Sequence, residues 1–140
     1  MELAERTDRL AAAAIDVAVY LPVVLAGFFF AGNAHGVPGG AVLGALGLAM
    51  VALIGYQWYL LATLGQTIGK RQMGIKIVLV KDLSNGGFVA NVLLRVFASG
   101  VLKAVPVLGG LISIADPLLI FRDDRRCIHD HIAGTCVIKA

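Results

Sequence analysis

Charged residues are scarce in this chain of 140 residues: only 15% are Asp, Glu, Lys or Arg, whereas 59% are hydrophobic. An ordinary soluble domain has about 25% charged and about 45–50% apolar residues. A soluble domain of this size leaves much of its surface in water, so it could not bury so many apolar side chains. The composition therefore excludes an ordinary soluble domain and indicates that a lipid bilayer covers the excess apolar surface.

Cysteine is also scarce, with only Cys127 and Cys136 in the chain. Two cysteines do not make the disulfide framework that is typical of small secreted domains. A cleavable signal peptide is a poor match as well, because the first apolar run follows a polar stretch and is too long for an h-region.

Recognisable catalytic patterns are missing. No nucleophile–histidine arrangement stands out. The segment Gly65–Lys70 has three residues between its glycines instead of the four of a phosphate loop, and Arg71 stands where serine or threonine would bind magnesium. The formal net charge of +3 is not arranged as a basic stripe interleaved with aromatic residues. We therefore expect no enzyme activity, no cofactor and no nucleic-acid partner.

Two long apolar runs are present. Leu10–Phe30 contains one charged residue, Asp16, and Ala41–Thr63 contains none. As a helix, each run is at least about 30 Å long, which is enough to cross the hydrocarbon core of a bilayer. The second run ends in an aromatic belt that is typical of a membrane interface: Tyr56, Trp58 and Tyr59.

The third apolar region, residues 88–121, permits two interpretations. Residues 88–104 and 107–121 are predicted helical segments, separated by a bend near Pro106. Either the region enters the membrane and returns, as two short tilted helices or a re-entrant hairpin, or residues 88–104 lie at the interface and a single third span follows. Both interpretations give a small all-α bundle.

Two short segments, residues 75–80 and 134–139, have the character of β-strands. They are rich in β-branched residues and too short to span a membrane. We predict that they pair with each other at the membrane surface, in the manner of a β-hairpin.

Basic residues mark one side of the membrane. They precede the first span, follow the second and lie in the C-terminal tail, whereas the loop between the two spans has none. The positive-inside rule then places both termini and the 65–87 segment in the cytoplasm of a multi-pass protein of the cell membrane. An even number of crossings follows, which favours a region 88–121 that enters and returns.

Three motifs in this order resemble those of the RDD family of membrane proteins. The first is Arg9-Leu-Ala-Ala-Ala-Ala-Ile-Asp16. The second is Gly65-Gln-Thr-Ile-Gly-Lys-Arg71, followed by Gly74-Ile-Lys-Ile. The third is His129-Asp-His-Ile-Ala-Gly-Thr135.

The resemblance implies a single RDD-like transmembrane domain over residues 1–140 of a bacterial or archaeal protein. The family is named for one arginine and two aspartates, and these correspond to Arg9, Asp16 and Asp130, with Asp116 as a rival for the second aspartate. Transport, including sodium–proton exchange for some members, has been proposed for the family.

Asp16 is the first candidate site, because an acidic residue inside a span is costly and often functional. Arg9 lies two turns away on the same helix face, at about 10 Å, which is too far for an ion pair within the helix. Asp16 is then either a proton or cation site, or a structural acceptor that joins its helix to a neighbouring helix or to the loop Gly65–Arg71.

Asp116 and Ser113 form the second candidate site. Pro117 disfavours helix at Asp116 and leaves the carbonyl of Ser113 without its helical donor. Hydroxyl, carboxylate and carbonyl oxygens suit a small hard cation. Alternatively, the segment simply ends here and Asp116 reaches the surface.

Further polar residues support these sites. Arg95 is expected either to pair with Asp16 or Asp116 or to extend to the interface, and Lys103 to extend to the interface. Lys70 and Arg71 supply the basic part of the loop after the second span.

The C-terminal cysteines and histidines have the chemistry of zinc ligands, but their spacing matches no standard zinc motif, so we expect no metal. A pH-sensitive latch made by His129 and Asp130 is the preferred interpretation of these residues.

Two functions remain open. In the first, a homo-oligomer transports a small cation or proton, with Asp16 and Asp116 as alternating sites and Arg9 biasing their ionisation. In the second, the protein is a non-transporting scaffold or assembly factor whose basic cytoplasmic edge binds anionic lipids or a partner protein.

Overall fold

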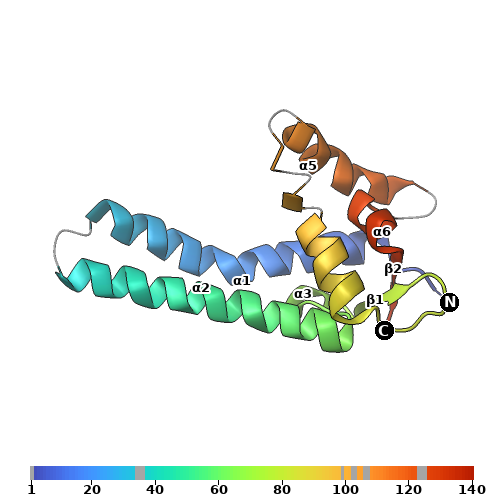
Figure 1. The fold of residues 1–140 in the computed structure, drawn as a ribbon, viewed down its shortest axis with the longest axis horizontal. Coiled ribbons are helices and arrows are strands. Elements are labelled where there is room, and N and C mark those ends of the chain that lie inside the picture. Colours follow the sequence, from blue (N-terminus) through green and yellow to red (C-terminus); the bar gives the residue numbers. More distant parts are fainter. Residues whose placement is uncertain (1, 34–36, 99, 102–103, 106–107, 123–125) are drawn as a thin grey trace.

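The computed structural model describes residues 2–33, 37–98, 100–101, 104–105, 108–122 and 126–140. Helices dominate, and one small antiparallel sheet lies at the end of the molecule that holds both termini (Figure 1). The predicted fold class, a helical membrane protein with one short strand pair, is confirmed.

The two longest helices, α1 (Arg6–Asn33) and α2 (Val37–Leu64), form an antiparallel hairpin (Figure 1). Each has 28 residues and is therefore about 42 Å long. Both are long and apolar enough to cross a membrane, and 0% of their apolar stretches is buried inside the protein. Large side chains such as Phe28 and Leu48 are 76% and 73% exposed, as expected for helices solvated by lipid.

The strands β1 (Ile75–Leu79) and β2 (Thr135–Lys139) pair antiparallel. The register sets Ile75 opposite Lys139 and Leu79 opposite Thr135, so the predicted pairing of these two segments is confirmed. The N-terminal segment joins the same sheet through an isolated bridge between Leu3 and Ile138. Three segments that are far apart in sequence are therefore fastened together at one end of the hairpin.

The third apolar region is divided into separate helical elements, and the expected bend at Pro106 lies outside the described residues. It contains the π-helix η1 (Val89–Ala98), the helix α5 (Leu108–Leu118) and the 3-10 turn η2 (Leu119–Phe121). Neither η1 nor α5 has the roughly 20 residues that a spanning helix needs. The π-helix η1 packs against α2, whereas α5 stands apart from the hairpin, toward the end of the molecule that holds the termini (Figure 1).

A small apolar core lies where these elements meet. It combines Ala12 of α1, Leu61 of α2, Val92 of η1 and residues of both strands, and all of these are at most 5% exposed. The short helix α3 (Ile68–Gln72) folds back from the end of α2 and packs against α1. This core fixes the positions of the polar side chains described next.

Candidate functional site

Asp130 lies at the centre of a buried cluster of charged side chains. It belongs to the short helix α6 (Ile128–Ala133), and its side chain is 0% exposed. Its Oδ2 atom accepts a hydrogen bond from Arg9 Nη2 at 2.6 Å and another from the backbone N–H of Cys127 at 3.1 Å. Its Oδ1 atom lies 2.9 Å from Arg95 Nη2. The carboxylate therefore links α1 and η1 to α6.

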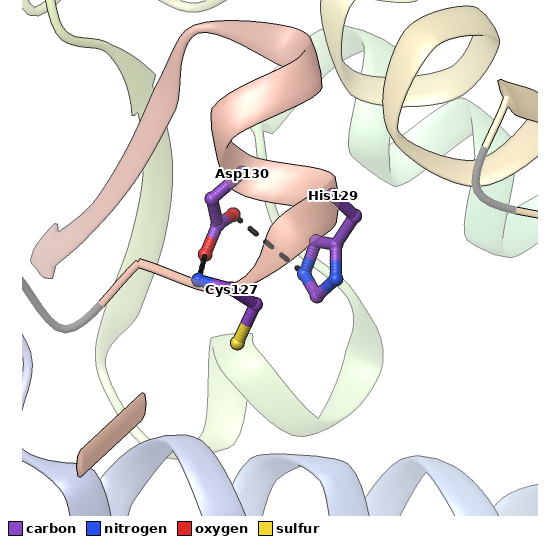
Figure 2. A group of neighbouring side chains, drawn as sticks. All are labelled: Cys127, His129 and Asp130. Atoms are coloured by element: carbon purple, nitrogen blue, oxygen red, sulfur yellow. Dashed lines mark hydrogen bonds and ion pairs between the residues drawn. The ribbon is translucent and has the colours of Figure 1, made fainter. Parts of the chain in front are cut away.

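The local sequence explains how Asp130 reaches this position. Cys127 is the N-cap of α6, and an aspartate three residues later accepts a hydrogen bond from the N-cap backbone, as in a capping box (Figure 2). Gly134 then ends the helix in a left-handed conformation with φ 63°, which glycine adopts without a steric penalty. The chain enters β2 directly afterwards, so the sheet holds α6 in place.

Ion pairing outweighs burial in setting the ionisation of Asp130. Burial by itself raises the pKa of this carboxyl, but the positive charges of Arg95, His129 and Arg9 outweigh burial and lower the net pKa to about 2. Asp130 is consequently ionised at any physiological pH. A carboxylate that stays charged is a poor proton carrier and a strong partner for guanidinium groups.

Arg95 has a different partner from those that the sequence suggested, and Arg9 has a partner that the sequence analysis did not name. We expected Arg95 to pair with Asp16 or Asp116 or to extend to the interface; it pairs with Asp130 and is only 7% exposed. Arg9 pairs with Asp130 as well, and its Nη2 also lies 3.6 Å from the sulfur of Cys127. The reason is tertiary, because η1 and α6 pack against each other and bring Arg95 to the carboxylate.

His129 lies beside the same ion pairs. Its Nε2 atom is 3.0 Å from Arg95 Nη2 and 3.6 Å from Asp130 Oδ1 (Figure 2). A neutral ring accepts a hydrogen bond from Arg95 through Nε2, whereas a protonated ring would place two cations in contact. The predicted pH-sensitive role of His129 thus has a geometric basis and stays a prediction.

Cys127, His129 and Asp130 also form a group with metal-ligand chemistry. Their sulfur, nitrogen and oxygen atoms all lie within 4.8 Å of one another. The donor hydrogens of Arg9 and Arg95 already point at these atoms, and two guanidinium groups would repel a divalent cation. The geometry therefore favours a carboxylate held by arginines over a metal centre.

Asp16 has no arginine partner among the described residues and is surrounded by hydrogen-bond donors. Its Oδ1 atom accepts from Gln57 Nε2 at 3.1 Å and from the backbone N–H of Gly69 at 2.8 Å, and its Oδ2 atom accepts from Thr67 Oγ1 at 2.6 Å. These donors come from α2 and from the start of α3. Asp16 therefore fastens the segment after α2 to the first helix, which is one of the two roles considered for it.

Gly69 allows α3 to approach α1 closely. A Cβ atom at this position would collide with the backbone carbonyl of Ala12 and lie 3.1 Å from the carboxyl carbon of Asp16. The Gly69 N–H reaches Asp16 only because no side chain separates the two helices. Thr67 supports the arrangement as the N-cap of α3, accepting from the backbone N–H of Lys70 at 3.2 Å.

Lys70 adds a cation that interacts electrostatically with both Asp16 and Asp130. Burial and, to a smaller degree, the charge of Arg95 lower its pKa; Asp16 acts in the opposite direction, Arg9 and Asp130 contribute less, and the net pKa is about 8. The folded protein therefore binds this proton more weakly than the unfolded chain, whose lysine has a pKa of 10.5. The destabilisation due to Lys70 is fully present below pH 8 and disappears as the pH rises toward 10.5.

This gives a testable pH dependence. Lys70→Met should melt at a higher temperature than wild type at pH 7, and the difference should shrink as the pH approaches 10. Lys81→Met removes an exposed lysine after β1 and should show no such trend. Thermal unfolding in detergent across this pH range measures both differences, and a constant offset for Lys70→Met would contradict the lowered pKa.

The second candidate site is only partly described. The side chains of Ser113 and Asp116, and Lys103 as a whole, lie outside the described residues. The backbone shows that the expected break at Asp116 is wrong, because α5 continues to Leu118 before it tightens into η2. Pro117 falls in the last turn, where a proline with helical φ removes one hydrogen bond without reversing the chain.

Polar residues that the sequence analysis did not single out complete the network. Gln57 bridges Asp16 and the backbone N–H of Ile68. Asn91 donates to the carbonyl of Leu61, and Asn85 to those of Ala62 and Thr63, at 2.9 Å each. These carbonyls belong to the last turns of α2, where helical donors run out. Gln57 and Asn91 could have been identified from the sequence, because each is a single amide side chain in an otherwise apolar segment.

Comparison with known proteins gives a consistent result. The sequence model of the RDD family matches residues 3–134. An uncharacterized protein of Haemophilus influenzae is 28% identical over 120 residues, which cover 83% of this chain and 66% of that protein. This chain thus spans slightly less than two thirds of that relative. No solved structure matches. The match over almost the whole chain, together with the buried contact between Arg9 and Asp130, leads to one conclusion: the chain belongs to the RDD family of membrane proteins.

Proposed function

We propose that this protein is a non-enzymatic membrane scaffold, in which α1 and α2 anchor a rigid platform that binds a partner at the membrane surface. One observation carries the proposal. Each carboxylate oxygen of Asp16 and Asp130 already accepts hydrogen bonds or ion pairs from the protein. Groups used in this way stabilise an arrangement of segments, and most of their acceptor capacity is already taken by the protein itself.

The platform consists of α3, β1, β2 and α6, and the proposal places it in the cytoplasm. The N-terminal segment, β1 and β2 are hydrogen-bonded to one another, so they share one side of a membrane. Basic residues in and around the platform are exposed or half-buried, among them Lys76, Lys81, Arg126 and Lys139. The positive-inside rule assigns such an end to the cytoplasmic side of the cell membrane, where an acidic partner surface would meet it.

Cation–proton exchange is the second candidate, and one observation favours it. Asp16 is only partly buried and lies within the apolar part of α1, facing Gln57 of α2. A carboxylate at that depth can take part in ion translocation. In this mechanism Asp16 and Asp116 alternate as binding sites, and the pathway forms between subunits of a homo-oligomer, because one subunit encloses little volume.

Asp16→Asn separates the two functions. If the protein is a scaffold, wild type in liposomes should produce no cation or proton flux above that of protein-free liposomes. The variant should melt at a lower temperature, because the amide nitrogen that replaces one carboxylate oxygen cannot accept a hydrogen bond from Thr67 or Gly69. We expect a loss of about 1–3 kcal/mol in unfolding free energy. The measurements are flux by an enclosed pH dye and melting in detergent.

A different pair of results would overturn the scaffold proposal. Wild type would exchange cations for protons, and Asp16→Asn would abolish that exchange while keeping the wild-type melting temperature. Asp82→Asn is the matched control, since Asp82 is exposed and, among the described residues, its side chain accepts hydrogen bonds from Ser84 of its own loop. It should change neither flux nor melting temperature.

A further inference from the structure

A hollow of about 300 Å³ lies between α2 and α3, away from the Asp130 cluster. Its lining is mixed in character: Tyr56, Leu60, Ile68, Arg71 and Gln72. Leu60 is buried and lies at the bottom of the hollow, whereas Arg71 and Gln72 are exposed at its rim. The hollow therefore offers an apolar floor and a polar, positively charged edge.

Arg71 supplies the positive charge of this edge. Among the residues that the structure describes, no carboxylate pairs with its guanidinium, in contrast to the two arginines on Asp130. Lys70 precedes it in α3, and the Gln72 amide adds donors next to it. A planar guanidinium with free donors is suited to a phosphate group, which it binds through two parallel hydrogen bonds.

The depth of the hollow in the membrane identifies the kind of phosphate. Tyr56 and Leu60 lie about 12 Å and 6 Å inside the end of α2 at Leu64, at the level of the aromatic belt that marks the interface. On the same face of α2, toward the middle of the span, Ala49 and Ala52 are exposed and small. An acyl chain can therefore run along this track while its headgroup remains beside Arg71.

We propose that the hollow binds one anionic glycerophospholipid, with the phosphate on Arg71 and Gln72, the glycerol against Leu60 and Ile68, and an acyl chain along α2. The charge of the rim selects an anionic headgroup over a zwitterionic one, whose ammonium group would face Arg71. The continuous apolar track selects a lipid over a soluble phosphate. The inference holds whether the protein is a scaffold or a carrier, because in the described part of the chain the side chains of Arg71 and Gln72 take no part in the Asp16 or Asp130 networks.

The test is native mass spectrometry of the detergent-purified protein with phosphatidylglycerol or phosphatidylcholine. Wild type should bind phosphatidylglycerol more tightly, and Arg71→Gln should reduce this preference about tenfold, the effect of losing a charge-assisted pair of hydrogen bonds. Gln72→Glu, which places a carboxylate beside Arg71, should reduce it as well. Lys81→Gln removes the same charge from an exposed turn outside the hollow and should keep the wild-type preference.

Further arms make each outcome decisive. Melting in phosphatidylcholine nanodiscs should be unchanged for both hollow variants, and if one fails to fold the other carries the test. Equal losses for Arg71→Gln and Lys81→Gln would mean diffuse surface charge and would overturn the site. Displacement of the lipid by inorganic phosphate or glycerol phosphate at the same concentration would also overturn it, since the hollow would then take a soluble anion.

Discussion

Replacing Asp130 with asparagine should lower the unfolding free energy by about 3–5 kcal/mol, because two buried guanidinium groups would lose their counter-charge. Arg9 and Arg95 are only 8% and 7% exposed, so water cannot replace the carboxylate. A loss of this size is a large fraction of the stability of an ordinary domain. Thermal unfolding in detergent, followed by size-exclusion chromatography, should show little folded Asp130→Asn protein at temperatures where wild type is intact.

A matched comparison shows whether the charges themselves matter or only their balance. Asp82→Asn makes the same chemical change on the surface and should melt like wild type. The triple variant Arg9→Met, Arg95→Met, Asp130→Leu removes the whole buried ion cluster and should recover much of the lost stability, since apolar replacements of such clusters are often neutral or stabilising. If Asp130→Asn melts within a degree of wild type, the cluster does not hold the fold together.

Acid should reproduce part of the Asp130→Asn effect in wild type. The folded pKa of Asp130 is about 2, below its ordinary value of 3.8, so the cluster contributes its full stability above pH 3.8. That contribution is lost as the pH falls through 2. The triple variant lacks the group and should show a flatter decline between pH 4 and pH 2.

Gly69→Ala should be the second severe substitution, with a loss of about 3 kcal/mol from overpacking. The added methyl group would meet the backbone carbonyl of Ala12, which cannot rotate away as a side chain would. α3 would move off α1, and Asp16 would lose its hydrogen bond from the Gly69 N–H. Melting in detergent measures the loss, and protease sensitivity of the segment after α2 should increase with it.

Gly55→Ala is the control for this experiment. Gly55 lies in α2, and a Cβ atom there would meet nothing within 4 Å. Alanine also favours helix by about 1 kcal/mol over glycine, so this variant should be as stable as wild type or more so. If Gly69→Ala had the same melting temperature as Gly55→Ala, the result would contradict the close packing of α3 on α1.

The features that the sequence predicted correctly are local or compositional. Two long apolar runs, of which the first contains one charged residue, predicted α1 and α2. The β-branched segments predicted a strand pair that the structure confirms at Ile75–Leu79 and Thr135–Lys139. These predictions depend on run length, periodicity and side-chain branching, all of which can be read from neighbouring residues. The family resemblance followed from three short motifs and is confirmed over residues 3–134.

The features that the sequence could not decide are contacts between distant segments. Arg95 pairs with Asp130, a residue on a different helix, instead of the two aspartates that lie in apolar runs. The sequence analysis also did not predict that residues 89–98 form a π-helix. The side chains of a π-helix point in directions that differ from those in an α-helical projection of the same residues.

By itself, the sequence determined that this is a membrane protein with two long helices that are apolar enough to span a bilayer, and that buried arginines and aspartates must find partners. Lipid offers no water to an isolated charge, so the need for a partner follows from composition alone. Only the tertiary structure decided which partner each charge takes. The close contact at Gly69 brings hydrogen-bond donors to Asp16. The packing of η1 and the β-sheet around α6 brings Asp130 within ion-pair distance of Arg9 and Arg95. Partner choice depends on how the helices pack, and no single segment encodes that packing.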